Sequence, residues 1–159
     1  MTTRIGTWAI VIAMTGTVCL AGHTLEVTAV ERGDVLVLGG SWTTRLVGVQ
    51  APAPDERCGR EALAFTRDAV EGSVVAVFTL TRDNTAATIV RDEQDMPLAE
   101  IRYGENEDVD LAAELLRRGL AHVDGAFLPE QLDHYRDLER EARRSGVGVW
   151  APAPGCPTP

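Results

Sequence analysis

Lysine is absent from this chain, and cations of any kind are scarce. Its 15 basic residues are all Arg and face 24 Asp and Glu residues, which gives a formal net charge of −9 at pH 7. Tight binding to nucleic acid without sequence preference needs clustered cations that displace counterions from the phosphates. The charge balance therefore predicts weak or no nucleic-acid binding of this kind, although it leaves room for a local Arg patch.

The first 21 residues have the layout of a secretory signal peptide. Arg4 precedes an uncharged run from Ile5 to Ala21, and small residues at Cys19 and Ala21 have the spacing of a cleavage site. We expect cleavage after Ala21, export to the periplasm or the cell exterior, and no transmembrane segment in the mature chain. The alternative is a retained membrane anchor, for which the run barely reaches the ~20 apolar residues that a span needs.

Cysteine is also rare, with three residues in the chain. Removal of the first 21 residues leaves two of them, Cys58 and Cys156. It also leaves 14 Arg and 24 acidic residues, so the net charge of the mature chain is −10. In an oxidising compartment an even pair favours a disulfide, here between the loop before the first predicted helix and the C-terminal tail. Two unrelated thiols are the alternative, because a bridge requires a short Cα distance that the sequence does not give.

Hydrophobic periodicity and turn residues predict one domain over residues 22–150 and a Pro-rich tail over 151–159. The order of its segments is β-β-β-α-β-β-α-α, or the same order with one strand split. It is that of an α+β protein, an OB-fold five-stranded barrel with three helices. The predicted strands are around Leu25–Ala29, from Val35 to the Gly39-Gly40 turn, and over Thr43–Val49, Val74–Leu80, Thr85–Val90 and Leu98–Tyr103. The predicted helices are Gly59–Glu71, Leu111–Arg118 with Asp110 as its cap, and a third from Pro129 or Glu130 to near Gly146 and Gly148.

Four sequence motifs follow one another along this domain. They are RLVGV from Arg45, CGREALAF from Cys58, ELLRRGLA from Glu114, and E-x-x-A-x-x-x-G-x-G-x-W ending at Trp150. Together they resemble the thermonuclease (staphylococcal nuclease-like, or SNase-like) family over roughly Val27 to Trp150. The resemblance implies a calcium-dependent nuclease that hydrolyses DNA or RNA, in which acidic side chains hold the metal, two Arg neutralise the phosphate and a Glu positions or activates water.

Two residues match the chemistry that this resemblance implies. Asp34 falls on a metal-ligating acid in the family's Asp-Gly-Asp-Thr turn, and Arg45 falls on a phosphate-contacting Arg that opens the motif Arg-Leu-x-Gly-Ile-Asp-x-Pro-Glu. Each has an alternative interpretation. Asp34 is also typical of a β-turn, where its side chain bonds to the local backbone, and Arg45 could be an ordinary surface residue of a strand.

Three other positions do not match. Gln50 stands at that motif's metal-ligating Asp, Ala53 at its Glu, and Met96 at the family's second Arg. An amide is a weaker ligand than a carboxylate for a hard cation, and a methyl group can neither ligate nor accept a proton. Arg91 lies five positions before Met96, and an odd shift along a strand points a side chain to the opposite face.

Asp55 and Glu56 follow the mismatched positions and could return a carboxylate to the site. The alternative is that they are solvated acids near a helix N-terminus, which we favour because Pro52 and Pro54 stiffen the loop. The sequence thus predicts an exported SNase-like protein, a pseudoenzyme without efficient catalysis that acts as a binding or structural module, with no cofactor. The alternatives are a divergent secreted nuclease that uses Ca²⁺, and a protein that binds a protein or peptide partner through its acidic surface.

Overall fold

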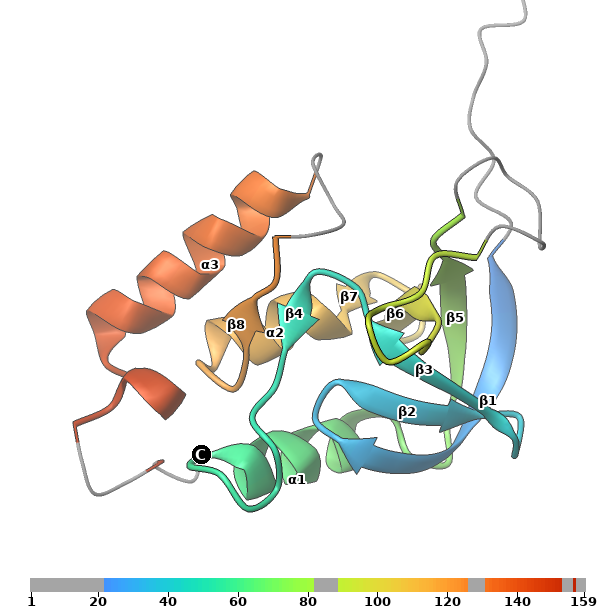
Figure 1. Cartoon of the computed structure of the whole chain (residues 1–159), viewed down its shortest axis with the longest axis horizontal. Helices are drawn as coiled ribbons and strands as arrows, with labels where there is room; N and C mark the ends of the chain where they lie inside the picture. Colours follow the sequence, from blue (N-terminus) through green and yellow to red (C-terminus); the bar gives the residue numbers. More distant parts are fainter. Residues whose placement is uncertain (1–21, 82–88, 126–130, 153–155, 157–159) are drawn as a thin grey trace, which may run out of the picture.

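Five strands form a closed barrel in the computed structural model, which describes residues 22–81, 89–125, 131–152 and 156. Neighbouring strands pair in the order β3-β2-β1-β5-β6, and a parallel pairing between β3 and β6 closes the ring (Figure 1). The strands are β1 (His23–Arg32), β2 (Val35–Leu38), β3 (Trp42–Leu46), β5 (Val74–Thr79) and β6 (Leu98–Tyr103). This arrangement confirms the OB-fold barrel that the sequence predicts.

The barrel interior is filled by apolar residues of the strands. Val27 and Val30 of β1, Leu36 and Leu38 of β2, and Ile101 of β6 are all almost fully buried. The pairing of β1 with β2 shifts register twice, between Val27 and Ala29 and between Val30 and Arg32. Such irregularities increase the local twist of a strand and so help a small sheet to close.

Of the helices in the described residues, α1 (Gly59–Val70) and α2 (Leu111–Arg117) pack on the barrel, and α3 (Leu132–Ser145) packs on α2 and on β8 (His122–Val123). α1 and α2 begin at their predicted first residues and end one residue before their predicted last ones. α1 lies along the lower side of the barrel in Figure 1 and contacts β1. The predicted start of the last helix, at Pro129 or Glu130, lies outside the described residues. None of the helices described has both the length and the apolar character needed to cross a membrane.

The predicted strand Thr43–Val49 is wrong in one respect, because the structure divides it. Val47 and Gly48 form a turn, and Gly48 has a φ of 78°, which only Gly adopts at little cost. The next two residues form β4 (Val49–Gln50), which pairs with β8 (His122–Val123) outside the barrel. A short β7 (Val109–Asp110) extends the sheet beside β6. Of the predicted strand Thr85–Val90 only the end is described, where Ile89 forms a single bridge with Thr81.

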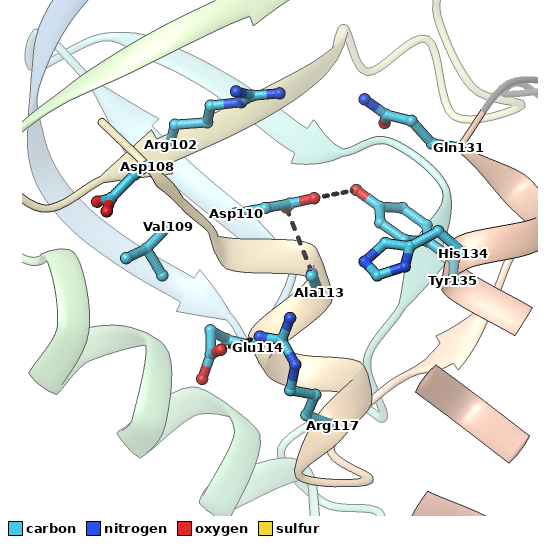
Figure 2. Close-up of a pocket in the computed structure, with 10 residues that line it drawn as sticks. All are labelled: Arg102, Asp108, Val109, Asp110, Ala113, Glu114, Arg117, Gln131, His134 and Tyr135. Atoms are coloured by element: carbon cyan, nitrogen blue, oxygen red, sulfur yellow. Dashed lines mark hydrogen bonds and ion pairs between the residues drawn. The ribbon is translucent and has the colours of Figure 1, made fainter. Parts of the chain in front are cut away.

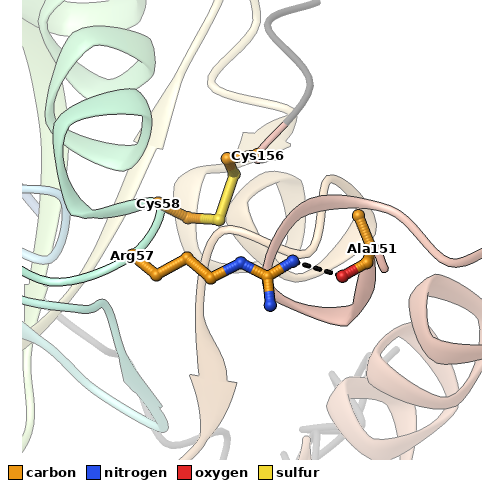
Figure 3. Close-up of a disulfide and its surroundings, with 4 residues drawn as sticks. All are labelled: Arg57, Cys58, Ala151 and Cys156. Carbon is orange, nitrogen blue, oxygen red and sulfur yellow. Dashed lines mark hydrogen bonds between the residues drawn. A yellow bond between two sulfur atoms is a disulfide. The ribbon is translucent and has the colours of Figure 1, made fainter. Parts of the chain in front are cut away.

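A disulfide joins Cys58 to Cys156, as the sequence predicts (Figure 3). The two Cα atoms are 5.3 Å apart, and Cys58 lies directly before α1. Beside the bridge, the Arg57 guanidinium donates a hydrogen bond to the Ala151 carbonyl. The segment after α3 is therefore fixed to the loop that begins α1, and the bridge suggests an oxidising environment.

Candidate functional site

Arg45 lies at the end of β3 and is 8% exposed, so it is not a surface residue of the strand. Its Nη1 donates to Asp92 Oδ2 at 3.0 Å, and its Nη2 donates to Asp124 Oδ2 at 2.8 Å. Charged hydrogen bonds of this length are among the strong ones in proteins. Both ends of the guanidinium fork are thus bound to carboxylates of the same chain.

Asp34 lies in the turn between β1 and β2, and its side chain is fully buried. The Arg32 guanidinium binds it with two bonds, from Nε to Oδ1 at 2.5 Å and from Nη2 to Oδ2 at 3.0 Å. Arg45 Nε donates no hydrogen bond within the part of the chain that the structure describes, but it lies 3.6 Å from Asp34 Oδ2. The hydrogen bond that Arg32 donates to Asp34 raises the pKa of Arg32 above its ordinary value, which keeps Arg32 charged. Asp34 is therefore neutralised by Arg32, with Arg45 close by.

Backbone pairing brings Asp34 and Arg45 together. The Asp34 carbonyl accepts a hydrogen bond from Leu46 N at 2.8 Å, which aligns the turn with the end of β3. Thr66 of α1 is also fully buried, and its Oγ1 donates to the Gly33 carbonyl at 2.7 Å. The turn is thus held from β3 on one side and from α1 on the other, and its carboxylate has a fixed position.

The other two acids reach Arg45 from distant parts of the chain. Asp92 opens a tight turn before β6, where its Oδ1 accepts hydrogen bonds from Gln94 N and Met96 N, both at 2.9 Å. Asp124 follows β8, and its backbone N–H donates to the Gly48 carbonyl at 2.9 Å. We call the five residues Arg32, Asp34, Arg45, Asp92 and Asp124 the Arg45 cluster.

None of the three mismatched positions supplies a charge to this cluster. Gln50 is exposed in β4 and pairs with His122, and Ala53 is partly buried. Met96 lies in the turn that Asp92 organises. Arg91 is exposed and donates from Nη1 to the Asp95 carbonyl at 2.7 Å.

Glu56 turns back toward one of the mismatched positions. Its Oε2 accepts a hydrogen bond from Ala53 N at 2.8 Å, and its charge is one of the smaller contributions that raise the pKa of Arg32. Asp55 and Glu56 are both exposed. The Glu56 carboxylate thus lies beside Ala53, the position where the resemblance places a Glu. It is exposed, however, and its hydrogen bond is to the local backbone.

Calcium, which the resemblance implies, does not fit the residues that are present. Ca²⁺ takes 6–8 oxygen ligands in proteins, most of them carboxylates and carbonyls. Both oxygens of the buried Asp34 carboxylate are bonded to Arg32, and Gln50 offers only an exposed amide. Across residues 22–81, 89–125, 131–152 and 156, no three His, Cys, Asp or Glu side chains are grouped so as to hold a metal ion.

Sequence reasoning found Asp34 and Arg45 but missed Arg32, Asp92 and Asp124 as their partners. The signal for Arg32 was present, because it stands at the first Asp of the family's Asp-Gly-Asp-Thr turn, so an acid is replaced by a cation. Asp92 and Asp124 lie 47 and 79 residues after Arg45. No local pattern links residues that far apart.

A separate polar cavity of about 350 Å³ lies between β6, β7, α2 and α3 (Figure 2). At its centre Tyr135 OH donates to Asp110 Oδ2 at 2.7 Å, while Asp110 Oδ1 accepts from Ala112 N and Ala113 N. Burial raises the pKa of Asp110 and that of Tyr135 above their ordinary values. Asp110 Oδ1 thus caps α2, and Asp110 Oδ2 binds Tyr135 of α3. The Asp110–Tyr135 hydrogen bond therefore connects α2 to α3.

A larger, mainly apolar groove of about 670 Å³ runs between α1 and the end of α2. Phe65, Leu120 and Val147 line it, and Arg60, Arg117 and Arg118 also border it. The Arg118 guanidinium lies over the Phe65 ring, 4.5 Å from its centre. The volume lies in the range of ordinary ligand-binding clefts.

Comparison with known proteins agrees with the fold. The family model described as "Staphylococcal nuclease homologue" matches residues 43–152. The chain is also 36% identical over 114 residues to a protein of Pyrenophora tritici-repentis (strain Pt-1C-BFP) named "Probable endonuclease lcl3". That alignment covers 67% of this chain and 40% of the relative, so the chain spans less than half of the relative's length. The family match includes Arg45, Asp92 and Asp124, and it begins after Arg32 and Asp34.

Proposed function

Because this chain belongs to the staphylococcal nuclease homologue family, we propose that it is an exported nuclease-fold protein without efficient catalysis that acts as a binding or structural module. Its family position rests on the match over residues 43–152 and on the five-stranded barrel with three helices. Function within a fold depends on the residues at the site, and these have changed here.

One observation carries the proposal: the Arg45 guanidinium is bound at both ends by Asp92 and Asp124. A phosphate could contact either end of it only by displacing one of these carboxylates, of which the Asp92 side chain is 5% exposed and that of Asp124 is 27% exposed. Removal of one partner from a buried pair typically costs about 3–5 kcal/mol. The carboxylates of Asp34, Asp92 and Asp124 would also repel a phosphate. Arg45 therefore stabilises the fold and is not available for substrate.

The replaced residues act in the same direction. Loss of one group that stabilises a transition state typically lowers a rate by ~10²–10³. Gln50, Ala53 and Met96 replace a metal ligand, a Glu and an Arg of the family pattern. Such effects are not additive, but together they reduce hydrolysis far below that of an efficient nuclease.

Export and a binding role rest on different features. The Cys58–Cys156 disulfide favours an oxidising compartment, in agreement with the signal-like first 21 residues. The apolar groove beside Phe65 and Leu120 supports binding. The net charge of −9 favours a protein or peptide partner over nucleic acid.

The test is a nuclease assay on the purified chain, with single-stranded DNA and with RNA, in calcium and in chelator. We expect no calcium-stimulated cleavage. Arg45→Ala serves as the control, because a contaminating nuclease would give the same background in both preparations. Calcium-dependent cleavage by the wild type that disappears in Arg45→Ala would refute the proposal.

A second candidate is a divergent secreted nuclease that hydrolyses DNA or RNA with Ca²⁺. It is favoured by the Glu56 side chain, which binds Ala53 N and so returns a carboxylate to the loop. The relative's name, probable endonuclease, points the same way. If cleavage is found, Glu56→Gln should abolish it while the neighbouring Asp55→Asn leaves it intact. Equal activity in both variants would show that the cleavage does not depend on Glu56.

A further inference from the structure

We infer that the Arg32 guanidinium takes the place of a divalent cation as the partner of Asp34, so that the Arg45 cluster is a built-in ion-pair network that needs no metal. The inference deepens the proposed function and rests on it for the location of the site. It assigns Asp34 a structural role and Arg32 a role that no family motif suggests. It follows from the disagreement between the implied calcium and the side chains that are present.

Both carboxylate oxygens of Asp34 already accept hydrogen bonds from Arg32. Arg32 Nε binds Oδ1 at 2.5 Å and Nη2 binds Oδ2 at 3.0 Å, in the two-bond arrangement that suits a guanidinium and a carboxylate. Arg45 Nε is 3.6 Å from Oδ2. The Asp34 side chain is 0% exposed and that of Arg32 is 28% exposed, so solvent reaches the pair only from the Arg32 side.

The charges of the cluster are close to balance. Arg32 and Arg45 carry two positive charges, and Asp34, Asp92 and Asp124 carry three negative ones. A buried carboxylate needs a nearby positive charge, and Arg32 supplies it from within the chain. A divalent ion brought to Asp34 would instead face two guanidinium groups at short range, and their repulsion would oppose its binding.

The backbone holds Arg32 in this position. Arg32 is the last residue of β1 and pairs with Val35 across the turn, so its side chain needs to span only Gly33 to reach Asp34. The carboxylates of Asp34, Asp92 and Glu56 all raise its pKa, with the Asp34 hydrogen bond as the largest cause. The cation is therefore permanent and does not depend on ion concentration.

The experiment compares Arg32→Asp with Arg67→Asp. Both make the same change in net charge, but Arg67 is about half exposed, with its Nε 3.4 Å from Glu71 Oε2 and its Nη2 donating to the Val30 carbonyl at 3.2 Å. The melting temperature and calorimetric calcium binding are measured in calcium and in chelator. We expect no calcium response in the wild type or in Arg67→Asp. We expect Arg32→Asp to be less stable in chelator and to be stabilised by millimolar calcium, since a ligand of the folded state raises its stability.

When Arg32→Asp folds, either of two results would overturn the inference. One is calcium binding by the wild type that is lost in Asp34→Asn. The other is a folded Arg32→Asp variant that binds calcium no better than Arg67→Asp. If Arg32→Asp does not fold, Arg32→Gln and Arg67→Gln are compared by urea unfolding, and an equal loss of stability in the two would also overturn it.

These outcomes are separable from those of the proposed function. Calcium binding by a wild type that cleaves nothing would refute the role of Arg32 and leave the loss of catalysis intact. Cleavage by a wild type that binds no calcium and is insensitive to chelator would refute the loss of catalysis and leave the role of Arg32 intact.

Discussion

Arg45 Nη2 donates a hydrogen bond to Asp124 Oδ2 at 2.8 Å, and the two residues are 79 positions apart in the sequence. The same guanidinium binds Asp92, so β3, the turn before β6 and the end of β8 meet at one cation. Figure 1 shows β4 and β8 lying together between the barrel and α3. Arg45 therefore joins the barrel to this outer layer.

Arg45→Met should destabilise the fold by about 3–5 kcal/mol, because it leaves the nearly buried Asp92 carboxylate without its cation. The measurement is the free energy of unfolding from urea titration. Arg67→Met is the matched control, with an exposed ion pair to Glu71 that contributes at most about 1 kcal/mol. A loss in Arg45→Met no larger than in the control would show that the Arg45 cluster does not stabilise the protein.

Removal of the disulfide should cost about 4–5 kcal/mol by the loop-closure model, since the bridge joins residues 98 positions apart. The variant is Cys58→Ala with Cys156→Ser, and urea unfolding gives the loss. A reducing agent should lower the stability of the wild type by a similar amount and leave the variant unchanged. If the variant instead remains sensitive to reductant, the bridge is not the group being reduced.

Asp110 should make stability depend on pH. Burial raises its pKa above the ordinary 3.8, although the hydrogen bond from Tyr135 and the amides of α2 act in the opposite direction. The folded state then holds the proton more tightly than the unfolded state. The resulting stabilisation is complete below pH 3.8 and is lost as the pH rises through the raised pKa.

The measurement is urea unfolding of the wild type and Asp110→Asn from pH 3.5 to pH 7. The stability of the wild type relative to the variant should fall over that window and then become constant. In Tyr135→Phe the window should move to higher pH, because a bond that lowers the Asp110 pKa is removed. A relative stability that rises with pH would contradict the direction of the shift.

The fold could be predicted from the sequence to a large extent, because its signals are local. Apolar runs between turn residues mark the strands, and Asp110 has the side chain that caps α2. Strict alternation does not hold along β1, where the register shifts bury Val30 as well as Val27. The division after β3 was missed, because the apolar run hides a turn that depends on the positive φ of Gly48. That turn carries Gln50 out of the barrel and into the pairing with His122.

The candidate site could be predicted only in part. Motif positions identified Asp34 and Arg45, and the Arg32 replacement was visible in the same turn. The partners Asp92 and Asp124 could not be found in this way, because their approach to Arg45 depends on how β6 and β8 pack around the barrel. Which charges remain available for a substrate is thus decided by tertiary contacts and not by the residue types alone.

The same reasoning predicts that restoring the motif residues will not restore catalysis. Gln50→Asp, Ala53→Glu and Met96→Arg together would return the carboxylates and the guanidinium that the family pattern contains. In this variant Arg32 would still bind Asp34, and Asp124 would still bind Arg45. We expect calcium-stimulated cleavage of single-stranded DNA to stay at background.

Addition of Arg32→Asp and Asp124→Ala to that variant should produce cleavage. The first change frees Asp34 for a metal, and the second frees one end of the Arg45 guanidinium for a phosphate. A single oriented donor of this kind is worth ~10²–10³ in rate. The cleavage rate of the variant with five substitutions should therefore exceed that of the variant with three by at least that factor. If the variant with only the three motif substitutions already cleaves DNA, the ion pairs of the Arg45 cluster open readily. The missing motif residues are then the whole cause of the loss of catalysis.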